Sequence, residues 1–235
     1  MPFDGSPPTK CSGNYRKRNS PPPPAGDGAV LPSSSATAPI TESGTVALLG
    51  RVEPPRQREY LTPAEVDLLI AAARKRGRYG HRDATMILVA YRHGLRVGEL
   101  VALQWSQFDL AAGDVHIARL KGGKPSRQPL KGDEIRALRR VQREQPAHSR
   151  YVFLSERGAP MTPRGFALML SRAAASIAFP FPVHPHMLRH ACGYKLANDG
   201  RDTRAIQDYL GHKQISCTVR YTELAPGRFD DFWND

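Results

Sequence analysis

Proline is distributed unevenly along this chain of 235 residues, and its distribution limits where a folded core can form. Eleven of the 21 prolines fall within residues 1–55, including the run PPPP, which is followed by the polar stretch SSSATAP. Such a stretch cannot bury enough apolar surface to offset the entropy lost when its backbone is ordered. We therefore expect a disordered tail over residues 1–55 and one folded domain over residues 56–235, which is long enough to bury a substantial core.

From residue 60 onward, helical segments follow one another, and several have a start or stop signal. Thr62 is a candidate N-cap, Pro63 suits the first helical position, and Glu65 would complete a capping box. Glycines at positions 94, 200 and 211 are placed to end later helices. The expected helices cover about residues 63–73, 82–93, 97–105, 132–145, 162–178, 185–199 and 202–210, with a last short helix around Tyr221.

Between the third and fourth of these helices, the sequence favours a β-hairpin. The segment DVHIARL is followed by the glycine-bearing turn KGGKPS and then by RQPLK. A second β signal, YVFLS at residues 151–155, predicts a short strand. The expected fold class is therefore α+β, mostly helical, with a small antiparallel sheet.

The excess of basic side chains indicates a polyanionic partner. The chain has 34 Lys and Arg against 22 Asp and Glu, a net charge of +12, and residues 1–55 contribute only +1 of it. Nucleic acid is the simplest partner for such a domain, although an indifferent basic surface would have the same composition. Three cysteines are too few for a disulfide framework or a zinc ribbon, and no apolar run approaches ~18 residues. We therefore expect a cytoplasmic location.

The stretch HPHMLRH gathers three of the eight histidines around one arginine. If Pro185 lies in the first turn of a helix, His186, Arg189 and His190 share one face. The cluster could be a solvated polar face, a metal site that includes His184, or an oxyanion site in which the guanidinium binds phosphate oxygens. A metal is disfavoured, because Arg189 would place a fixed positive charge beside the cation and no carboxylate lies within the cluster.

Two other segments favour the oxyanion site. In YRHGLRVGEL, Arg96 follows a glycine and stands at the start of a helix, where backbone N–H groups and the helix dipole favour an anion. In YLGHKQISCTVRYTE, His212 follows a glycine, and Tyr221 lies nine residues further on.

In order, G-L-R-x-x-E-L, a lysine-bearing hairpin, H-x-L-R-H, L-G-H and the later tyrosine resemble the tyrosine recombinases of the phage integrase family. The resemblance spans roughly residues 60–225, and it implies that residues 56–235 form the catalytic domain of that family. The part from HPHMLRH to VRYT, followed by GRF and Trp233, looks most like the recombinases that invert fimbrial promoter switches.

In this family a tyrosine attacks the scissile DNA phosphate, forms a 3′-phosphotyrosine link and frees a 5′-hydroxyl. The resemblance assigns this role to Tyr221, whereas Tyr194 and Tyr209 lie mid-helix, where packing explains them. It assigns Arg96 and Arg189 to the two guanidinium groups that hold the non-bridging oxygens and neutralise their charge in the transition state.

The resemblance also implies groups that transfer protons. His186 matches the histidine paired with the second arginine, which is expected to accept or relay the tyrosyl proton. His212 matches the later histidine that forms a hydrogen bond to the phosphate. Lys121 matches the hairpin lysine that protonates the leaving 5′-oxygen, with Lys124 as a close competitor.

Two further residues are expected to support the site. Glu99 would orient Arg96 or the start of its helix, although a surface charge is an open alternative. His190 would support Arg189 or the helix of Tyr221.

The resemblance implies a site-specific DNA recombinase that needs neither a cofactor nor a metal, because transesterification conserves the phosphoester bond energy. The expected partners are double-stranded DNA with inverted-repeat target sites, a homotetramer at synapsis and DNA-bending accessory proteins. Inversion of a short promoter-bearing segment is the leading role, whereas integration, excision or transposon recombination would use the same residues. A DNA-binding regulator without catalysis is disfavoured, because every position expected for chemistry carries the right residue type.

Overall fold

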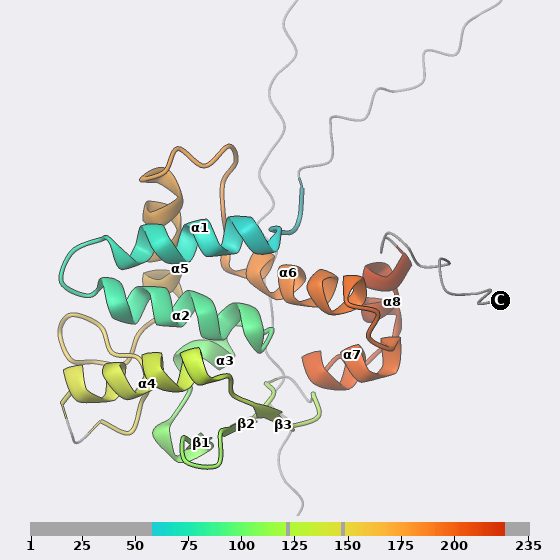
Figure 1. The fold of residues 1–235 in the computed structure, drawn as a ribbon, viewed down its shortest axis with the longest axis horizontal. Coiled ribbons are helices and arrows are strands. Elements are labelled where there is room, and N and C mark those ends of the chain that lie inside the picture. Colours follow the sequence, from blue (N-terminus) through green and yellow to red (C-terminus); the bar gives the residue numbers. More distant parts are fainter. Residues whose placement is uncertain (1–57, 121–122, 147–148, 224–235) are drawn as a thin grey trace, which may run out of the picture. The chain divides into compact units, whose positions relative to one another are not determined.

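A computed structural model describes residues 58–120, 123–146 and 149–223 of the chain. These residues form eight α-helices, one 3₁₀-helix and a three-stranded sheet (Figure 1). The expected α+β fold, mostly helical with a small antiparallel sheet, is therefore confirmed. The tail expected over residues 1–55 lies outside the described residues. The helices are α1 (Pro63–Arg74), α2 (Gly80–Arg92), α3 (Val97–Val101), α4 (Gly132–Glu144), α5 (Pro163–Ala175), α6 (Pro185–Asn198), α7 (Thr203–Leu210) and α8 (Ser216–Glu223).

Local signals set several helix boundaries. Thr62 caps α1, because its hydroxyl accepts a hydrogen bond from the backbone N–H of Glu65, and the Glu65 carboxylate accepts one from the Thr62 N–H at 2.8 Å. Gly211 ends α7 with a φ of +67°, a left-handed conformation that glycine adopts without steric penalty. In the described part of the chain, no helix is both long and apolar enough to cross a membrane.

The sheet has the strand order β1–β2–β3, and both strand pairs are antiparallel. Its strands are β1 (Phe108–Asp109), β2 (Asp114–Ile117) and β3 (Ser126–Pro129). The last two are the predicted hairpin, and their register pairs Val115 with Gln128. The first strand was not predicted, because two residues are too few to give a periodic pattern.

Two predicted elements differ from the structure. The helix expected over residues 97–105 ends at Val101, and a 3₁₀-helix, Trp105–Gln107, starts anew where the Gln107 side chain accepts a hydrogen bond from the Gln104 N–H. The strand expected at residues 151–155 is reduced to isolated bridges, because its backbone pairs with two separate segments: the Val152 N–H donates to the Leu103 carbonyl, and the Phe153 carbonyl accepts from the Met161 N–H.

The buried apolar side chains form two clusters, and α6 contributes to both. In the larger cluster, α2 packs against α1 and α4, and the first half of α6 packs against α2 and α5 (Figure 1). The smaller cluster holds α7 and α8 against the second half of α6. Thus α6 joins the main core to the helix that carries Tyr221. The smaller cluster consists of Cys192, Tyr194, Ala197, Ile206, Leu210 and Tyr221.

Candidate active site

Arg189 lies in α6, which begins at Pro185 as predicted, and only 1 % of the arginine is exposed. Its two terminal nitrogens donate to carbonyls of different segments, namely Gly94 between α2 and α3 and Leu210 at the end of α7. Burial lowers the pKa of Arg189 to about 10, and repulsion from Arg96 adds to the effect. The guanidinium is therefore still a cation at neutral pH, and it joins three segments that are far apart in the sequence.

Arg96 directly precedes α3, and Glu99 fixes it in two ways. The Glu99 carboxylate accepts hydrogen bonds from the Arg96 backbone N–H at 3.0 Å and from its guanidinium at 2.8 Å. Burial raises the pKa of Glu99, but the hydrogen bonds from Arg96 and the charge of Arg119 outweigh burial, so the pKa lies below its ordinary value. These contacts agree with the expectation that Glu99 orients Arg96. Because 31 % of the Arg96 side chain is exposed, its remaining donors can reach an anion.

Tyr221 lies in α8, and its ring packs into the smaller cluster with 1 % of the residue exposed. Its hydroxyl lies 2.8 Å from Nδ1 of His190, and its ring meets that of Tyr194 edge-on, with the centroids 5.0 Å apart. Burial raises the pKa of Tyr221 to about 12, although the charge of Arg189 opposes this change. The hydroxyl is therefore protonated at neutral pH and must lose its proton in order to act as a nucleophile.

Three histidines surround this tyrosine and its helix. The rings of His186 and His190 meet edge to face with their centroids 4.4 Å apart, and the ring of His212 stacks on that of Tyr221 at 6.2 Å. Nδ1 of His212 lies 2.8 Å from the Thr218 hydroxyl. Burial lowers the pKa of all three histidines, to about 4 for His190 and His212, and nearby charged groups add to the lowering. All three are therefore neutral at pH 7 and can accept a proton.

The structure brings five of the six predicted site residues into one region. Arg96 and Arg189 both lie close enough to His186 and His212 for their charges to lower the pKa of each histidine. The charge of Arg189 also acts on Tyr221, which stacks on His212. The residue before α3 and residues from α6, α8 and the α7–α8 turn therefore lie close enough for their charges to interact.

The sixth predicted residue, Lys121, lies outside the described residues. Its competitor Lys124 is described, and its Nζ atom lies 4.0 Å from the carboxylate of Asp208, with 86 % of the lysine side chain exposed. The choice between the two lysines therefore stays a prediction.

Two alternatives raised by the sequence, a metal site and a different nucleophile, can be compared with the described residues. No group of three or more His, Cys, Asp or Glu side chains among them could hold a metal ion, so His184 does not complete such a group with its neighbours. Tyr209 donates its hydroxyl to the Arg92 carbonyl at 2.9 Å, and Tyr194 packs on the ring of Tyr60 at 4.0 Å. These two tyrosines therefore have packing roles, as expected.

Sequence reasoning missed Arg119, a buried arginine behind the site. Its guanidinium donates to the Glu99 carboxylate at 3.0 Å, to the His93 carbonyl at 3.1 Å and to the Tyr209 carbonyl. A signal was present in the sequence, because side chains alternate between the two faces of a strand, so Arg119 shares the buried face of Ile117. Arg119 lies two residues past the end of β2 and continues this alternation, and a buried cation there needs a partner, which marks the residue as unusual.

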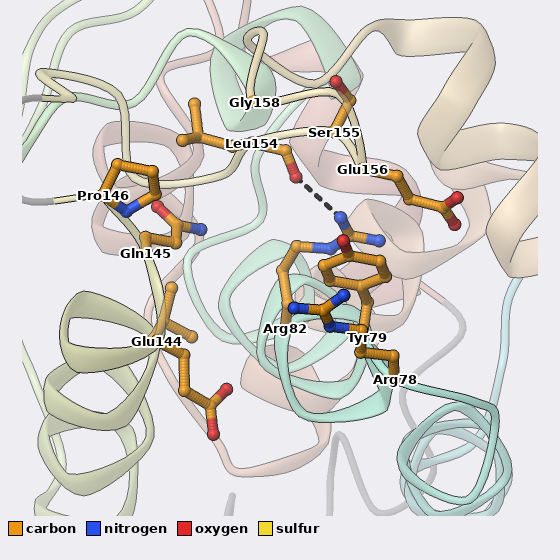
Figure 2. A pocket seen from close by; sticks show the side chains of 11 residues that line it. Arg78, Tyr79, Arg82, Glu144, Gln145, Pro146, Leu154, Ser155, Glu156 and Gly158 are labelled. Carbon is orange, nitrogen blue, oxygen red and sulfur yellow. Dashed lines mark hydrogen bonds between the residues drawn. The ribbon is translucent and has the colours of Figure 1, made fainter.

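A hollow of about 450 Å³ lies beside the start of α2 and the end of α4 (Figure 2). Arg82 lines it and donates to the Leu154 carbonyl at 2.7 Å and to the Asp83 carboxylate. None of the six predicted residues lines this hollow. Arg82 thus joins α2 to the segment before α5 and is separate from the candidate site.

Comparison with known proteins gives one matching family and several relatives. The model of the phage integrase family matches residues 59–228. The type 1 fimbriae regulatory proteins FimE and FimB of Escherichia coli K12 are 41 % and 39 % identical to this chain over 182 and 183 residues, which cover 75 % and 76 % of this chain and 91 % of each relative. The tyrosine recombinase XerD of Ralstonia nicotianae is 38 % identical over 184 residues, covering 75 % of this chain and 59 % of XerD.

The chain is also similar to solved structures. The crystal structure of XerA recombinase matches with a TM-score of 0.65 and 27 % identity, covering 76 % of this chain and 65 % of XerA. The XerH site-specific recombinase bound to its palindromic difH substrate matches with a TM-score of 0.63 and 22 % identity, covering 74 % and 52 % of the two chains. The likeness to XerH is one of fold alone.

Proposed function

Because this chain belongs to the phage integrase family, we propose that residues 56–235 form the catalytic domain of a site-specific tyrosine recombinase. Its substrate is double-stranded DNA, which would neutralise the excess positive charge that this part of the chain carries. The relative XerD, which is named a tyrosine recombinase, supports the same reaction type. The observation that supports the proposal is that Arg96 and Tyr221 both lie near enough to the buried guanidinium of Arg189 for their charges to act on its pKa.

In the proposed reaction, the phenolic oxygen of Tyr221 forms a bond to the scissile phosphorus while the bond from phosphorus to the 5′-oxygen breaks. The products are a 3′-phosphotyrosine and a free 5′-hydroxyl. Arg96 and Arg189 neutralise the two non-bridging oxygens, whose charge grows in the transition state, and His212 donates a hydrogen bond to the same phosphate. Lys121 is our assignment for the group that protonates the leaving oxygen, with Lys124 as its competitor.

The tyrosyl proton passes to a neutral histidine in this proposal. His190 lies within hydrogen-bond distance of the hydroxyl, and His186, the residue expected from the motif, packs against His190. The two rings therefore offer a path from the buried hydroxyl to the exposed side of the site. Variants of His186 and His190 distinguish a histidine that accepts the tyrosyl proton directly from one that relays it.

The biological role that we propose is inversion of a short promoter-bearing DNA segment between inverted repeats. The support is the similarity to FimE and FimB, fimbriae regulatory proteins that this chain matches over 91 % of their length. Four protomers at synapsis and DNA-bending accessory proteins complete the proposed assembly. A plasmid assay tests inversion directly. The plasmid carries a promoter between the inverted repeats taken from the source genome, and inversion keeps the length of the plasmid, whereas excision and integration change it.

A nicked duplex tests the chemistry. Cleavage next to the nick releases a short strand, which diffuses away, so the strand cannot be rejoined and the covalent intermediate accumulates. The unmodified chain is expected to give an SDS-resistant protein–DNA adduct, whereas Tyr221→Phe is expected to bind the duplex and give none. Tyr209→Phe is the matched control, because it removes another hydrogen-bonded tyrosine hydroxyl and leaves the candidate nucleophile in place. An adduct that persists in Tyr221→Phe would show that another residue is the nucleophile.

A further inference from the structure

Arg119 follows β2, and its side chain is completely buried, with 0 % of its surface exposed. We propose that Arg119 is a positioning residue for DNA cleavage: its side chain fixes the supports of Arg96, Arg189 and His212 without touching the DNA. This inference rests on the proposed recombinase function. Three sets of contacts carry it, and each set leads to a different one of these three residues.

The first contact is with Glu99, which Arg119 shares with Arg96. One carboxylate oxygen accepts from the Arg96 guanidinium and from the Leu120 N–H at 3.2 Å, and the other accepts from the Arg96 N–H and from Arg119 at 3.0 Å. Four donors thus saturate the carboxylate. If Arg119 is removed, the buried charge of Glu99 has Arg96 as its only guanidinium partner among the described residues, which draws Arg96 toward Glu99 and away from a phosphate.

The second set consists of backbone carbonyls, and it pairs Arg119 with Arg189. Arg119 donates to the carbonyls of His93 and Tyr209, whereas Arg189 donates to those of the next residue in each segment, Gly94 and Leu210. Two guanidinium groups therefore clamp the same pair of segments side by side. Without Arg119, Arg189 would be the one guanidinium among the described residues that bridges these segments, and it would have to do so while binding a phosphate.

The third contact supports the turn that carries His212. The aliphatic stem of Arg119 packs directly against Gly211, where a Cβ atom would lie 2.7 Å from Cγ of the arginine. The glycine of the L-G-H motif therefore leaves room for Arg119 in addition to adopting a left-handed conformation. The aliphatic part of the Arg119 side chain therefore packs against the backbone of this turn and supports it.

The charges of this group point to an anionic ligand. Arg96, Arg119 and Arg189 carry three positive charges, and Glu99 compensates one of them. The charged forms of these arginines are disfavoured where they lie. Burial, and after it repulsion from Arg96, lowers the pKa of Arg189, and burial lowers the pKa of Arg119 although Glu99 opposes the change. A phosphodiester supplies a negative charge at the exposed guanidinium of Arg96, so its arrival relieves the repulsion.

The test compares Arg119→Met and Arg119→Lys with a matched control, Arg82→Met. Arg82 is nearly as buried as Arg119, with 9 % of its side chain exposed, and it also pairs with a carboxylate and a carbonyl. Arg82 lies in the first turn of α2, and His93, whose carbonyl Arg119 binds, follows the last turn. The eleven residues between them correspond to roughly 16 Å along the helix at 1.5 Å per residue. Both methionine variants are therefore expected to lower the melting temperature, but only Arg119→Met is expected to slow cleavage.

Two measurements separate positioning from simple loss of stability. At a temperature where every variant is folded, Arg119→Met is expected to bind target DNA within about threefold of the unmodified chain and to form adduct about 100-fold more slowly, the scale seen when one transition-state donor is lost. Arg119→Lys keeps a charge opposite Glu99 but not the fork, so a loss of about tenfold is expected. The second measurement uses a methylphosphonate at the scissile position, which carries no charge and depends less on aligned guanidinium groups. On the methylphosphonate substrate, the loss of cleavage rate in Arg119→Met and Arg119→Lys is expected to be smaller than on the phosphate substrate.

Equal losses on the phosphate and methylphosphonate substrates, or cleavage by Arg119→Met at the unmodified rate, would overturn the inference. If Arg119→Met does not fold, Arg119→Lys carries the same comparison of substrates. Failure of the proposed function looks different, because the unmodified chain would then form no adduct on either substrate.

Discussion

Nδ1 of His190 lies 2.8 Å from the hydroxyl of Tyr221, and both residues are almost completely buried. Burial lowers the pKa of His190 to about 4 and raises that of Tyr221 to about 12, so both groups are neutral over a wide range of pH. The neutral phenol therefore donates a hydrogen bond to the neutral imidazole, and it must exchange this hydrogen bond for the phosphate when it attacks. The pair holds the candidate nucleophile in place before DNA is engaged.

The stability of the protein is expected to fall in mild acid because of His190. Its pKa is 6.5 in its ordinary state and about 4 in the fold, so between these values the unfolded chain binds a proton that the folded chain does not. The contribution of His190 is complete above pH 6.5 and is lost progressively as the pH falls toward about 4. His190→Gln is expected to show a weaker fall in melting temperature between pH 7 and pH 5. His116→Gln, a change at an exposed site on β2, is expected to keep the original pH dependence, and an unchanged slope in His190→Gln would contradict this account.

Gly193 is expected to be essential for seating Tyr221. A Cβ atom at Gly193 would lie 2.7 Å from the Tyr221 ring, so an added methyl must displace the ring or shift α8. Gly193→Ala is expected to lower stability by ~1–3 kcal/mol through overpacking, although alanine favours the helix by roughly 1 kcal/mol. Gly132→Ala is the control, because its methyl meets only the mobile end of Arg136. Thermal unfolding of both variants checks the prediction, and a Gly193→Ala protein as stable as the unmodified chain would refute it.

Arg189→Lys is expected to lose cleavage far more than DNA binding. Lysine keeps the charge but is a single point donor, so it cannot span the Gly94 and Leu210 carbonyls and also hold two phosphate oxygens. The rate of adduct formation is expected to fall by about 100-fold or more, a transition-state effect. Gel-shift affinity and adduct kinetics on the same duplex give both quantities. Equal losses in the two would make Arg189 a simple backbone contact.

Removal of divalent metal ions is expected to leave adduct formation unchanged. Arg96 and Arg189 can neutralise the phosphoryl oxygens, so the proposed reaction needs no Lewis acid. The measurement is the adduct yield with EDTA and with added Mg²⁺. Activity that disappears with EDTA and returns with the ion would revive a metal site at the histidines.

Four of the six candidate residues follow a local signal in the sequence. Arg96 and His212 follow helix-ending glycines, and His186 and Arg189 follow a proline that starts a helix. The family's order of motifs then joins these pieces, since it fixes residue types at set positions. The supporting residues were less predictable. The contacts of Arg119 join residues 20 to 90 positions apart, and no local pattern encodes which carbonyls a buried guanidinium will meet.

The sequence by itself determined the mostly helical fold, the hairpin and the set of residues that could act on a phosphate, because these depend on local propensity and on motif spacing. Only the tertiary structure decided that His190 is the histidine within reach of the Tyr221 hydroxyl and that two buried guanidinium groups clamp the same two segments. Packing of α6 against both apolar clusters produces these contacts. Whether a hydrogen bond forms depends on differences of a few tenths of an ångström in the distance between donor and acceptor, and only the assembled core defines this distance.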